Sequence, residues 1–299
     1  MKEPVFTGSA VAIVTPFNDD FSINYDEFKK FIDWQIDNGT DAIVVVGTSG
    51  EASTLSTVEH YEAMKFCIDY VNHRVPVICG AGSNNTEYGI KTAKKACEYG
   101  ADALLLVTPY YNKCTQKGLY EHYKMYHDAT DKPIIVYNVP SRTGVNIEPE
   151  TLKKLSALPR INGIKEASGN ISQVMKMKAI CGDDINIWSG NDDQIPAVMS
   201  CGGSGVISVL ANVCPQETHD MVQEYLDGNA FKCTEMMAKY LELANALFVE
   251  VNPIPVKAAC NMMGWNMGPC RRPLCDMTDE HTAYLKDVME RYGLYNTIK

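Results

Sequence analysis

Ala103-Leu104-Leu105-Leu106-Val107 is an uninterrupted apolar run in the first half of the chain. A strand with one face in water alternates apolar and polar residues, whereas a strand that is apolar throughout is typical of a parallel sheet covered on both faces. The run is followed by an amphipathic segment at residues 116–129 and by another apolar run at residues 133–138. This order predicts parallel strands joined by helices.

The same alternation extends in both directions along the chain. We predict eight strands, at residues 9–15, 41–47, 75–81, 102–107, 133–138, 162–165, 185–189 and 205–209. We predict a helix after each strand, at residues 25–38, 57–72, 86–99, 116–129, 149–157, 171–180, 192–200 and 215–226. Asn85 has the position of an N-cap, and Ser56 with Glu59 has the pattern of a capping box. Eight consecutive strand–helix units predict an α/β protein with a (β/α)8 TIM barrel. A doubly wound sheet is the alternative, but no G-x-G-x-x-G motif follows the first strand.

The pattern changes after Gly228, where only helical periodicity remains. We predict helices at residues 232–247, 254–263 and 279–292, with a connecting loop at residues 264–273. We therefore expect a catalytic barrel at residues 1–228 and a C-terminal helical domain at residues 229–299.

Composition limits the possible partners and ligands. The 299 residues are 45% hydrophobic and carry a formal net charge of −10, which argues against nucleic acid or an anionic membrane as a partner. No apolar run approaches the length of a membrane span, and no signal-peptide core is visible, so we expect a cytoplasmic protein. The eleven cysteines lack a C-x-x-C pattern and are expected to be free thiols. The six dispersed histidines give no support to a metal site, and no metal or cofactor is expected.

One lysine ends a predicted strand, in Asn162-Gly163-Ile164-Lys165-Glu166-Ala167-Ser168-Gly169. Burial disfavours the charged form of a lysine and lowers its pKa, so a buried amine can act as a nucleophile. Such an amine attacks carbonyl carbons and forms a Schiff base. The alternative is a lysine at an exposed strand end.

Catalytic residues of TIM barrels lie at the carboxyl ends of the strands. Tyr137 ends the strand next to that of Lys165, where its phenol can exchange protons with an amine or an imine. Arg142 lies in the following loop and has the fork geometry that binds a carboxylate. A surface salt bridge is the alternative role for Arg142.

Hydroxyl groups follow two other predicted strands. Thr48 and Ser49 lie in Gly47-Thr48-Ser49-Gly50-Glu51, and the backbone N–H groups of such a turn can hold a carboxylate. Tyr110 and Tyr111 follow the strand at residues 102–107. A plain turn and two packed tyrosines are the alternatives. Taken together, the polar residues predict one pocket with a nucleophile, a phenol, a hydroxyl turn and a cation for an anionic substrate.

The ends of the last two strands argue against a phosphosugar substrate. Phosphate-binding barrels hold the phosphate with the loops after strands 7 and 8. Here Asp192 and Asp193 follow strand 7, and residues 209–212 lack the glycines that would present amide groups.

Six motifs occur in order along the chain, at residues 47–51 (GTSGE), 108–112 (TPYYN), 137–144 (YNVPSRTG), 163–167 (GIKEA), 252–257 (NPIPVK) and 272–274 (RPL). Together they resemble the dihydrodipicolinate synthase / N-acetylneuraminate lyase family over essentially the whole chain. The sialic-acid lyases of this family lack an arginine at the position of Arg142, so the resemblance is to the synthases. Ser49 replaces the threonine that is usual at its position, which keeps the hydroxyl donor and loses a methyl group.

The resemblance implies that Lys165 forms an imine with pyruvate, whose enamine attacks L-aspartate 4-semialdehyde. It assigns proton transfer to Tyr137, with Thr48 and Tyr111 completing a relay, and it places Tyr111 across a dimer interface. The remaining implied roles concern substrate binding: Ser49, the backbone at Ile207 and Gly190 for the pyruvate, and Arg142 for the semialdehyde carboxylate. The implied assembly is a homotetramer built as a dimer of dimers.

Some members of the family are inhibited by lysine at the dimer interface. The positions that resemble this site are Ala52, Ser53, His60, Asn84 and Tyr110. Tyr88 stands where lysine-sensitive members carry a glutamate for the ligand's ammonium, although Glu87 is adjacent. We therefore expect weak or absent inhibition by lysine.

Two other functions compete with this interpretation. The nearest is a pyruvate-dependent aldolase of sugar acids, which would share the lysine and tyrosine but use another aldehyde; Arg142 argues against it. The other is a catalytically silent barrel that serves as a binding or structural protein, which the complete set of expected catalytic residues argues against.

Overall fold

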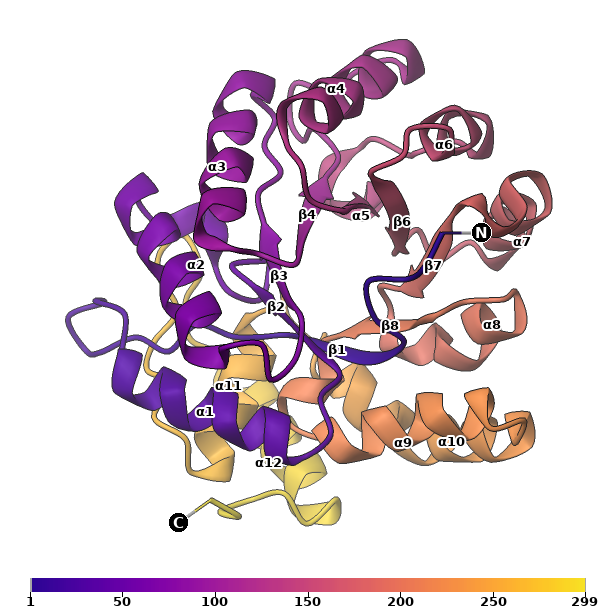
Figure 1. Ribbon diagram of the computed structural model, residues 1–299. Helices are drawn as coiled ribbons and strands as arrows, with labels where there is room; N and C mark the ends of the chain where they lie inside the picture. Colours follow the sequence, from indigo (N-terminus) through magenta and orange to yellow (C-terminus); the bar gives the residue numbers. More distant parts are fainter. Residues whose placement is uncertain (1, 299) are drawn as a thin grey trace.

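Eight parallel strands close into a barrel in the computed structural model, which describes residues 2–298 (Figure 1). The strands are β1 (Gly8–Ala12), β2 (Ala42–Val45), β3 (Val77–Gly80), β4 (Ala103–Val107), β5 (Ile134–Asn138), β6 (Ile161–Glu166), β7 (Asn186–Ser189) and β8 (Gly205–Ser208). They are paired in chain order, and β8 closes on β1. The predicted TIM barrel is therefore confirmed.

Helices surround the barrel and return the chain from one strand to the next (Figure 1). They are α1 (Tyr25–Asp37), α2 (Thr57–Val71), α3 (Thr86–Tyr99), α4 (Gln116–Ala129), α6 (Pro149–Ser156), α7 (Ile171–Cys181), α8 (Ile195–Ser200) and α9 (Pro215–Leu226). The side chain of Ser56 accepts from the N–H of Glu59, and the Glu59 carboxylate accepts from the N–H of Ser56. The predicted capping box is thus confirmed, as is the N-cap at Asn85.

Several predicted boundaries were wrong for local reasons. The first strand ends at Ala12 instead of residue 15, because the N–H of Val14 donates to the side chain of Asn212 and leaves the strand ladder. The helix expected at residues 192–200 is divided into a 3-10 turn, η3 (Asp192–Gln194), and α8, whose first turn contains Pro196. Proline lacks an N–H and favours the first helical turn, so a new helix begins there. The loop expected around Arg142 contains the short helix α5 (Pro140–Thr143).

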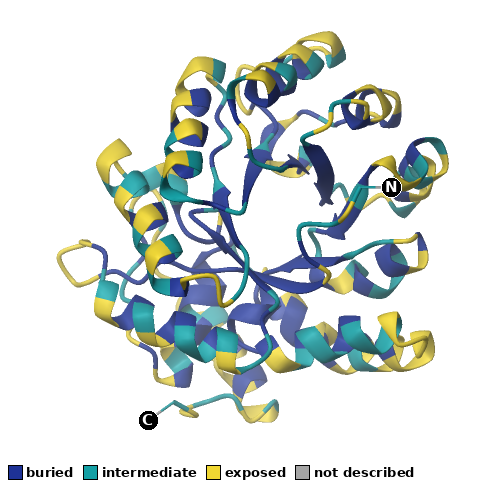
Figure 2. Cartoon of the chain, in the orientation of Figure 1, coloured by how far each residue is buried: buried dark blue, intermediate teal, exposed yellow. Residues whose placement is uncertain are grey.

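The strands bury both faces, as an apolar parallel sheet requires. Leu104 and Leu106 face the surrounding helices, whereas Leu105 faces the barrel interior with Ile78 and Ile135. In Figure 2 the strands form a largely buried ring, and the exposed residues lie mainly on the outer parts of the helices and in the loops.

The N-terminal segment covers the end of the barrel where the strands begin. The ring of Phe6 stacks on Trp188 with the ring centroids 5.1 Å apart, and the indole N–H of Trp188 donates to the Phe6 carbonyl. The ammonium of Lys2 donates to three carbonyl groups before and at the start of β6, those of Ser156, Leu158 and Ile161. These contacts lie at the opposite end of the barrel from the carboxyl ends of the strands, where the functional groups are expected.

Three helices follow the barrel, α10 (Ala230–Ala246), α11 (Ile254–Met263) and α12 (Asp279–Arg291). The helix α10 packs along α9, and α12 packs on α10 and α11 (Figure 1). The loop before α12 continues past residue 273, because Thr278 caps that helix. The C-terminal helical appendage is confirmed, whereas the domain boundary at residue 228 stays a prediction.

No helix within residues 2–298 combines the length and the apolar character needed to cross a membrane. All eleven cysteines are free, as expected.

Candidate active site

Lys165 points into the barrel near the end of β6. It is in register with Tyr137 on β5 and Trp188 on β7, so the three side chains share the interior face. Lys165 is only 5% exposed, and its Nζ lies 4.5 Å from the centroid of the Tyr137 ring. The alternative of an exposed lysine at a strand end is therefore wrong.

The surroundings of Lys165 favour its neutral form. Burial lowers the pKa of Lys165 to about 8, the charge of Asp192 opposes this shift, and the charge of Arg142 adds to it. At pH 7 about one tenth of an amine with this pKa is neutral, a far larger share than for an ordinary lysine, and the neutral form can attack a carbonyl carbon.

Tyr137 and Thr48 lie beside the amine. Tyr137 is buried, and burial raises the pKa of its phenol, while the charge of Arg142 and a hydrogen bond with Thr48 act in the opposite direction. Thr48 is exposed in the turn after β2. The phenol therefore stays protonated at neutral pH, and the hydroxyl of Thr48 connects it to the mouth of the barrel.

Ser49 and Arg142 are connected by a residue of the C-terminal appendage. The side-chain amide of Asn252 donates to Oγ of Ser49 at 3.1 Å, and the guanidinium of Arg142 donates to the Asn252 carbonyl at 3.1 Å. Asn252 is 5% exposed, whereas Arg142 keeps an exposed surface. Asn252 lies in the motif at residues 252–257, but no local sequence pattern shows that it reaches the barrel, so its role was not predicted.

The turn at residues 47–51 takes its shape from residues other than its glycines. Val46 and Glu51 have left-handed backbone conformations, with φ of 49° and 54°. This conformation is strained for a β-branched residue such as Val46. Gly50 is needed for another reason, since a Cβ there would lie 3.1 Å from Cα of Val46 and 3.2 Å from the Ile13 carbonyl oxygen.

The backbone N–H groups that follow β8 donate hydrogen bonds to a carboxylate of the protein itself. Asp192 is buried, and its Oδ2 accepts from the N–H groups of Val209 (3.1 Å) and Leu210 (2.9 Å). In a phosphate-binding barrel, amides of this loop would face the phosphate. Their use by Asp192 supports the expectation that the substrate is not a phosphosugar, and the contact itself was missed from the sequence.

Gly190 lies beside Lys165, and Ile207 lies in the barrel interior. A Cβ at Gly190 would lie 3.1 Å from Cε of Lys165 and 2.7 Å from Cβ of Ala167, so no larger residue fits beside the amine. Ile207 is buried in the barrel interior on β8.

The structure of a single chain does not bury Tyr111 in this site. Its side chain is 91% exposed in the loop after β4, its φ is 69°, and it makes no hydrogen bond within residues 2–298. The other predicted site residues (Lys165, Tyr137, Thr48, Ser49, Arg142, Gly190 and Ile207) lie at the carboxyl ends of the strands or in the connections that follow them.

The residues that resemble an inhibitory site lie in three neighbouring connections. Ala52 and Ser53 belong to the 3-10 turn η1 (Ala52–Thr54), and His60 lies on α2. Asn84 follows β3 and Tyr110 follows β4; the side chain of Asn112 donates to the Asn84 carbonyl and joins these two connections. The hydroxyl of Tyr88 forms a hydrogen bond with Oγ1 of Thr57.

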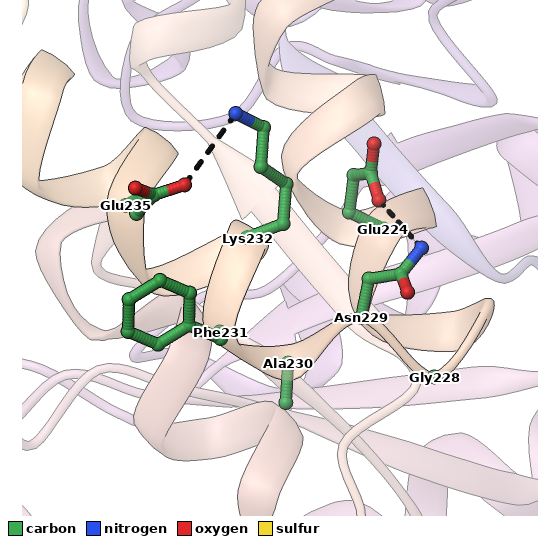
Figure 3. A pocket seen from close by; sticks show the side chains of 7 residues that line it. All are labelled: Glu224, Gly228, Asn229, Ala230, Phe231, Lys232 and Glu235. Carbon is green, nitrogen blue, oxygen red and sulfur yellow. Dashed lines mark hydrogen bonds and ion pairs between the residues drawn. The ribbon is translucent and has the colours of Figure 1, made fainter.

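A surface hollow at the junction of α9 and α10 is separate from these residues (Figure 3). It is lined by Glu224, Gly228, Asn229, Ala230, Phe231, Lys232 and Glu235. Because the helices run antiparallel to the strands, the end of α9 lies at the N-terminal end of the barrel. The hollow is therefore at the opposite end from the Lys165 amine.

Residues 5–292 match the Dihydrodipicolinate synthetase family. The chain is 55% identical to a 4-hydroxy-tetrahydrodipicolinate synthase of Caldicellulosiruptor saccharolyticus, with 97% of this chain and 98% of the relative aligned. It is 52% identical to a protein of the same name from Clostridium perfringens, over 97% of this chain and 99% of the relative.

Solved structures agree with these sequence relatives. A dihydrodipicolinate synthase of Thermotoga maritima superposes with a TM-score of 0.95 at 42% identity, over 97% of this chain and 99% of that one. A chloride-inhibited dihydrodipicolinate synthase of Acinetobacter baumannii, complexed with pyruvate, superposes with a TM-score of 0.94 at 40% identity, over 96% and 99% of the two chains. A relative from Cyanidioschyzon merolae, solved with lysine bound, has a TM-score of 0.95 at 38% identity and covers 98% and 100%.

Proposed function

Because the chain belongs to the dihydrodipicolinate synthetase family, we propose that it catalyses the 4-hydroxy-tetrahydrodipicolinate synthase reaction. In this reaction pyruvate condenses with L-aspartate 4-semialdehyde, in the biosynthesis of diaminopimelate and lysine. The observation that carries the proposal is the buried amine of Lys165, whose pKa is lowered to about 8 and whose Nζ lies against the ring of Tyr137.

The steps follow from the chemistry of a neutral amine. Nζ of Lys165 attacks the ketone carbon of pyruvate, and loss of water leaves an imine. Removal of a methyl proton gives the enamine, whose carbon forms a bond to the aldehyde carbon of the second substrate. The amino group of that substrate then attacks the imine carbon, which closes the ring and releases the lysine.

Proton transfer in these steps is assigned to Tyr137. Its buried phenol remains protonated near neutral pH and can give a proton to the oxygen that leaves as water. The hydroxyl of Thr48, which lowers the pKa of this phenol, is proposed to continue the path toward the mouth of the barrel.

Both substrates carry a carboxylate, and the site offers matching donors in a protein of net charge −10. The pyruvate carboxylate is assigned to Ser49, to the backbone at Ile207 and to the space beside Gly190. The carboxylate of the semialdehyde is assigned to Arg142, because a guanidinium binds a carboxylate with two parallel hydrogen bonds. Arg142 also favours this reaction over a pyruvate-dependent aldolase of sugar acids.

A homotetramer built as a dimer of dimers is part of the proposal. Tyr111 is 91% exposed in the single chain, which supports a role in the site of a second copy. Sedimentation velocity should give the mass of four chains, and Tyr111→Phe should lower turnover while leaving that mass unchanged. A fully active monomer would contradict the role of Tyr111.

A cytoplasmic location is also proposed. The eleven free cysteines support it, because a reducing compartment keeps thiols unpaired.

Reduction with borohydride tests the central step. We expect one pyruvate-derived adduct per chain, located on Lys165 by peptide mass, and we expect Lys165→Ala to abolish it. Turnover of pyruvate with L-aspartate 4-semialdehyde, compared with N-acetylneuraminate and 2-keto-3-deoxygluconate, distinguishes the synthase from the aldolases. A wild-type chain that forms no adduct would show that the barrel is not a Schiff-base enzyme.

A further inference from the structure

A buried ion pair joins the C-terminal appendage to the turn that carries Thr48 and Ser49. Nζ of Lys257, on the first turn of α11, lies 2.8 Å from Oε1 of Glu51, the last residue of the turn. The side chains are 2% and 0% exposed. The same ammonium donates to the Pro269 carbonyl at 2.9 Å and lies 4.0 Å from the centroid of the Phe17 ring.

The second oxygen of Glu51 holds the segment that follows α11. Its Oε2 accepts from the backbone N–H of Arg271 at 2.8 Å. The guanidinium of Arg271 in turn pairs with Glu59 on α2 and donates to the Thr54 carbonyl. Two acidic residues that follow β2 therefore hold the appendage against this side of the barrel.

The ion pair and a second contact, between Ser49 and Asn252, join the same two segments of the chain near the active site. Ser49 is two residues before Glu51 and is hydrogen-bonded to Asn252, which is five residues before Lys257. The Asn252 carbonyl accepts from Arg142. A displacement of Lys257 relative to Glu51 must therefore move Asn252 relative to the turn and to Arg142.

We propose that Glu51 and Lys257 are positioning residues of the active site, which hold the Thr48–Ser49 turn and Asn252 in register with each other. This inference rests on the proposed function and assigns the helical appendage a part in both substrate sites. Replacing a buried ion pair by uncharged residues of similar size is often neutral for stability, so stability alone does not account for this pair. The place of the pair does, since Glu51 is two residues after Ser49, Lys257 is five residues after Asn252, and Ser49 and Asn252 are hydrogen-bonded to each other.

The double variant Glu51→Gln with Lys257→Met tests the proposal, because it removes both charges at nearly constant volume. We expect it to fold, and we expect the pyruvate concentration for half-maximal borohydride trapping to rise about ten- to hundredfold, since a displacement of about 1 Å at a catalytic site can cost this much. The KM for the semialdehyde should rise as well, through Asn252 and Arg142. Glu51→Asp keeps the charge, moves the carboxylate and should produce the same direction of change, even if the double variant does not fold.

Glu242→Gln is the matched control, because it removes a carboxylate that pairs with Arg291 on the outer side of the appendage. This control should leave unchanged both the pyruvate concentration for half-maximal trapping and the KM for the semialdehyde. If Glu51→Asp and a folded double variant both reach half-maximal trapping at the wild-type pyruvate concentration, the positioning role is overturned and the proposed function remains intact. An unmodified wild-type chain after borohydride treatment would overturn both.

Discussion

Burial changes the protonation of Lys165 more than any neighbouring charge does. The side chain lies inside the barrel on the face it shares with Tyr137 and Trp188, where water cannot stabilise an ammonium. The charge of Asp192 opposes this shift; its Oδ2 accepts from two backbone N–H groups, whereas its buried Oδ1 has no hydrogen-bond partner within residues 2–298. The result is an amine that is both nucleophilic and able to carry a charge when the imine forms.

The pH dependence of imine formation follows from this pKa. Only the neutral amine attacks, so the trapping rate at limiting pyruvate should rise about tenfold per pH unit below pH 8 and level off above it. Asp192→Asn removes a charge that raises the pKa, so its midpoint should move to lower pH. Trapping rates measured from pH 6 to 10 check both statements. A midpoint near the ordinary lysine value would contradict the effect of burial.

At the scale of elements, the connections after the strands determine which groups reach the barrel mouth. The short helix α5 begins with Pro140, whose fixed φ suits a first helical position, and ends at Gly144 with φ of 68°. This single turn presents Arg142 toward Asn252 of the appendage. The site proposed for the second substrate therefore combines one barrel connection with one segment from outside the barrel.

Arg142→Ala should separate the two substrates. Loss of a hydrogen bond to a charged group costs about 1.5–3 kcal/mol, so the KM for L-aspartate 4-semialdehyde should rise about ten- to hundredfold. Trapping with pyruvate alone, measured above pH 9 where the amine of Lys165 is neutral, should remain near the wild-type rate. Steady-state kinetics with each substrate varied provides the measurement. Unchanged semialdehyde kinetics would show that Arg142 has another role.

At the scale of the whole molecule, exposed aromatic residues on α3 and in the loop after β4 occupy positions for which the resemblance predicts a part in regulation and assembly. Tyr110 is one of the positions that resemble a lysine site, and Tyr88, which is also exposed, provides no carboxylate for an ammonium. Glu87 is adjacent in sequence and exposed.

Millimolar L-lysine should therefore inhibit turnover weakly or not at all. Tyr88→Glu should strengthen inhibition about tenfold or more, because it supplies a charged partner for the ammonium. Titration of the initial rate with L-lysine in both proteins is the measurement. Strong inhibition of the wild-type chain would mean that another group binds the ammonium.

The sequence alone determined the barrel, the order of its elements and the place of Lys165, the proposed nucleophile, at the end of an apolar strand. These features are local: apolar strands alternate with amphipathic helices, the caps at Ser56 and Asn85 lie within three residues of the groups they bind, and Lys165 ends an apolar strand. The residues themselves suggested a phenol at Tyr137 and an anion-binding cation at Arg142, and the resemblance to a known family supplied the substrates and the other roles; all of these roles remain predictions.

Only the tertiary structure decided how the appendage meets the active site. Asn252 and Ser49 are 203 residues apart, and Lys257 and Glu51 are 206 residues apart, so no periodicity or capping pattern connects them. The contact between Asp192 and the amides after β8 was missed for the same reason. Such pairs exist because the closed barrel and the helices behind it bring distant segments together and exclude water from the polar groups between them, and buried polar groups are stable only when they are paired.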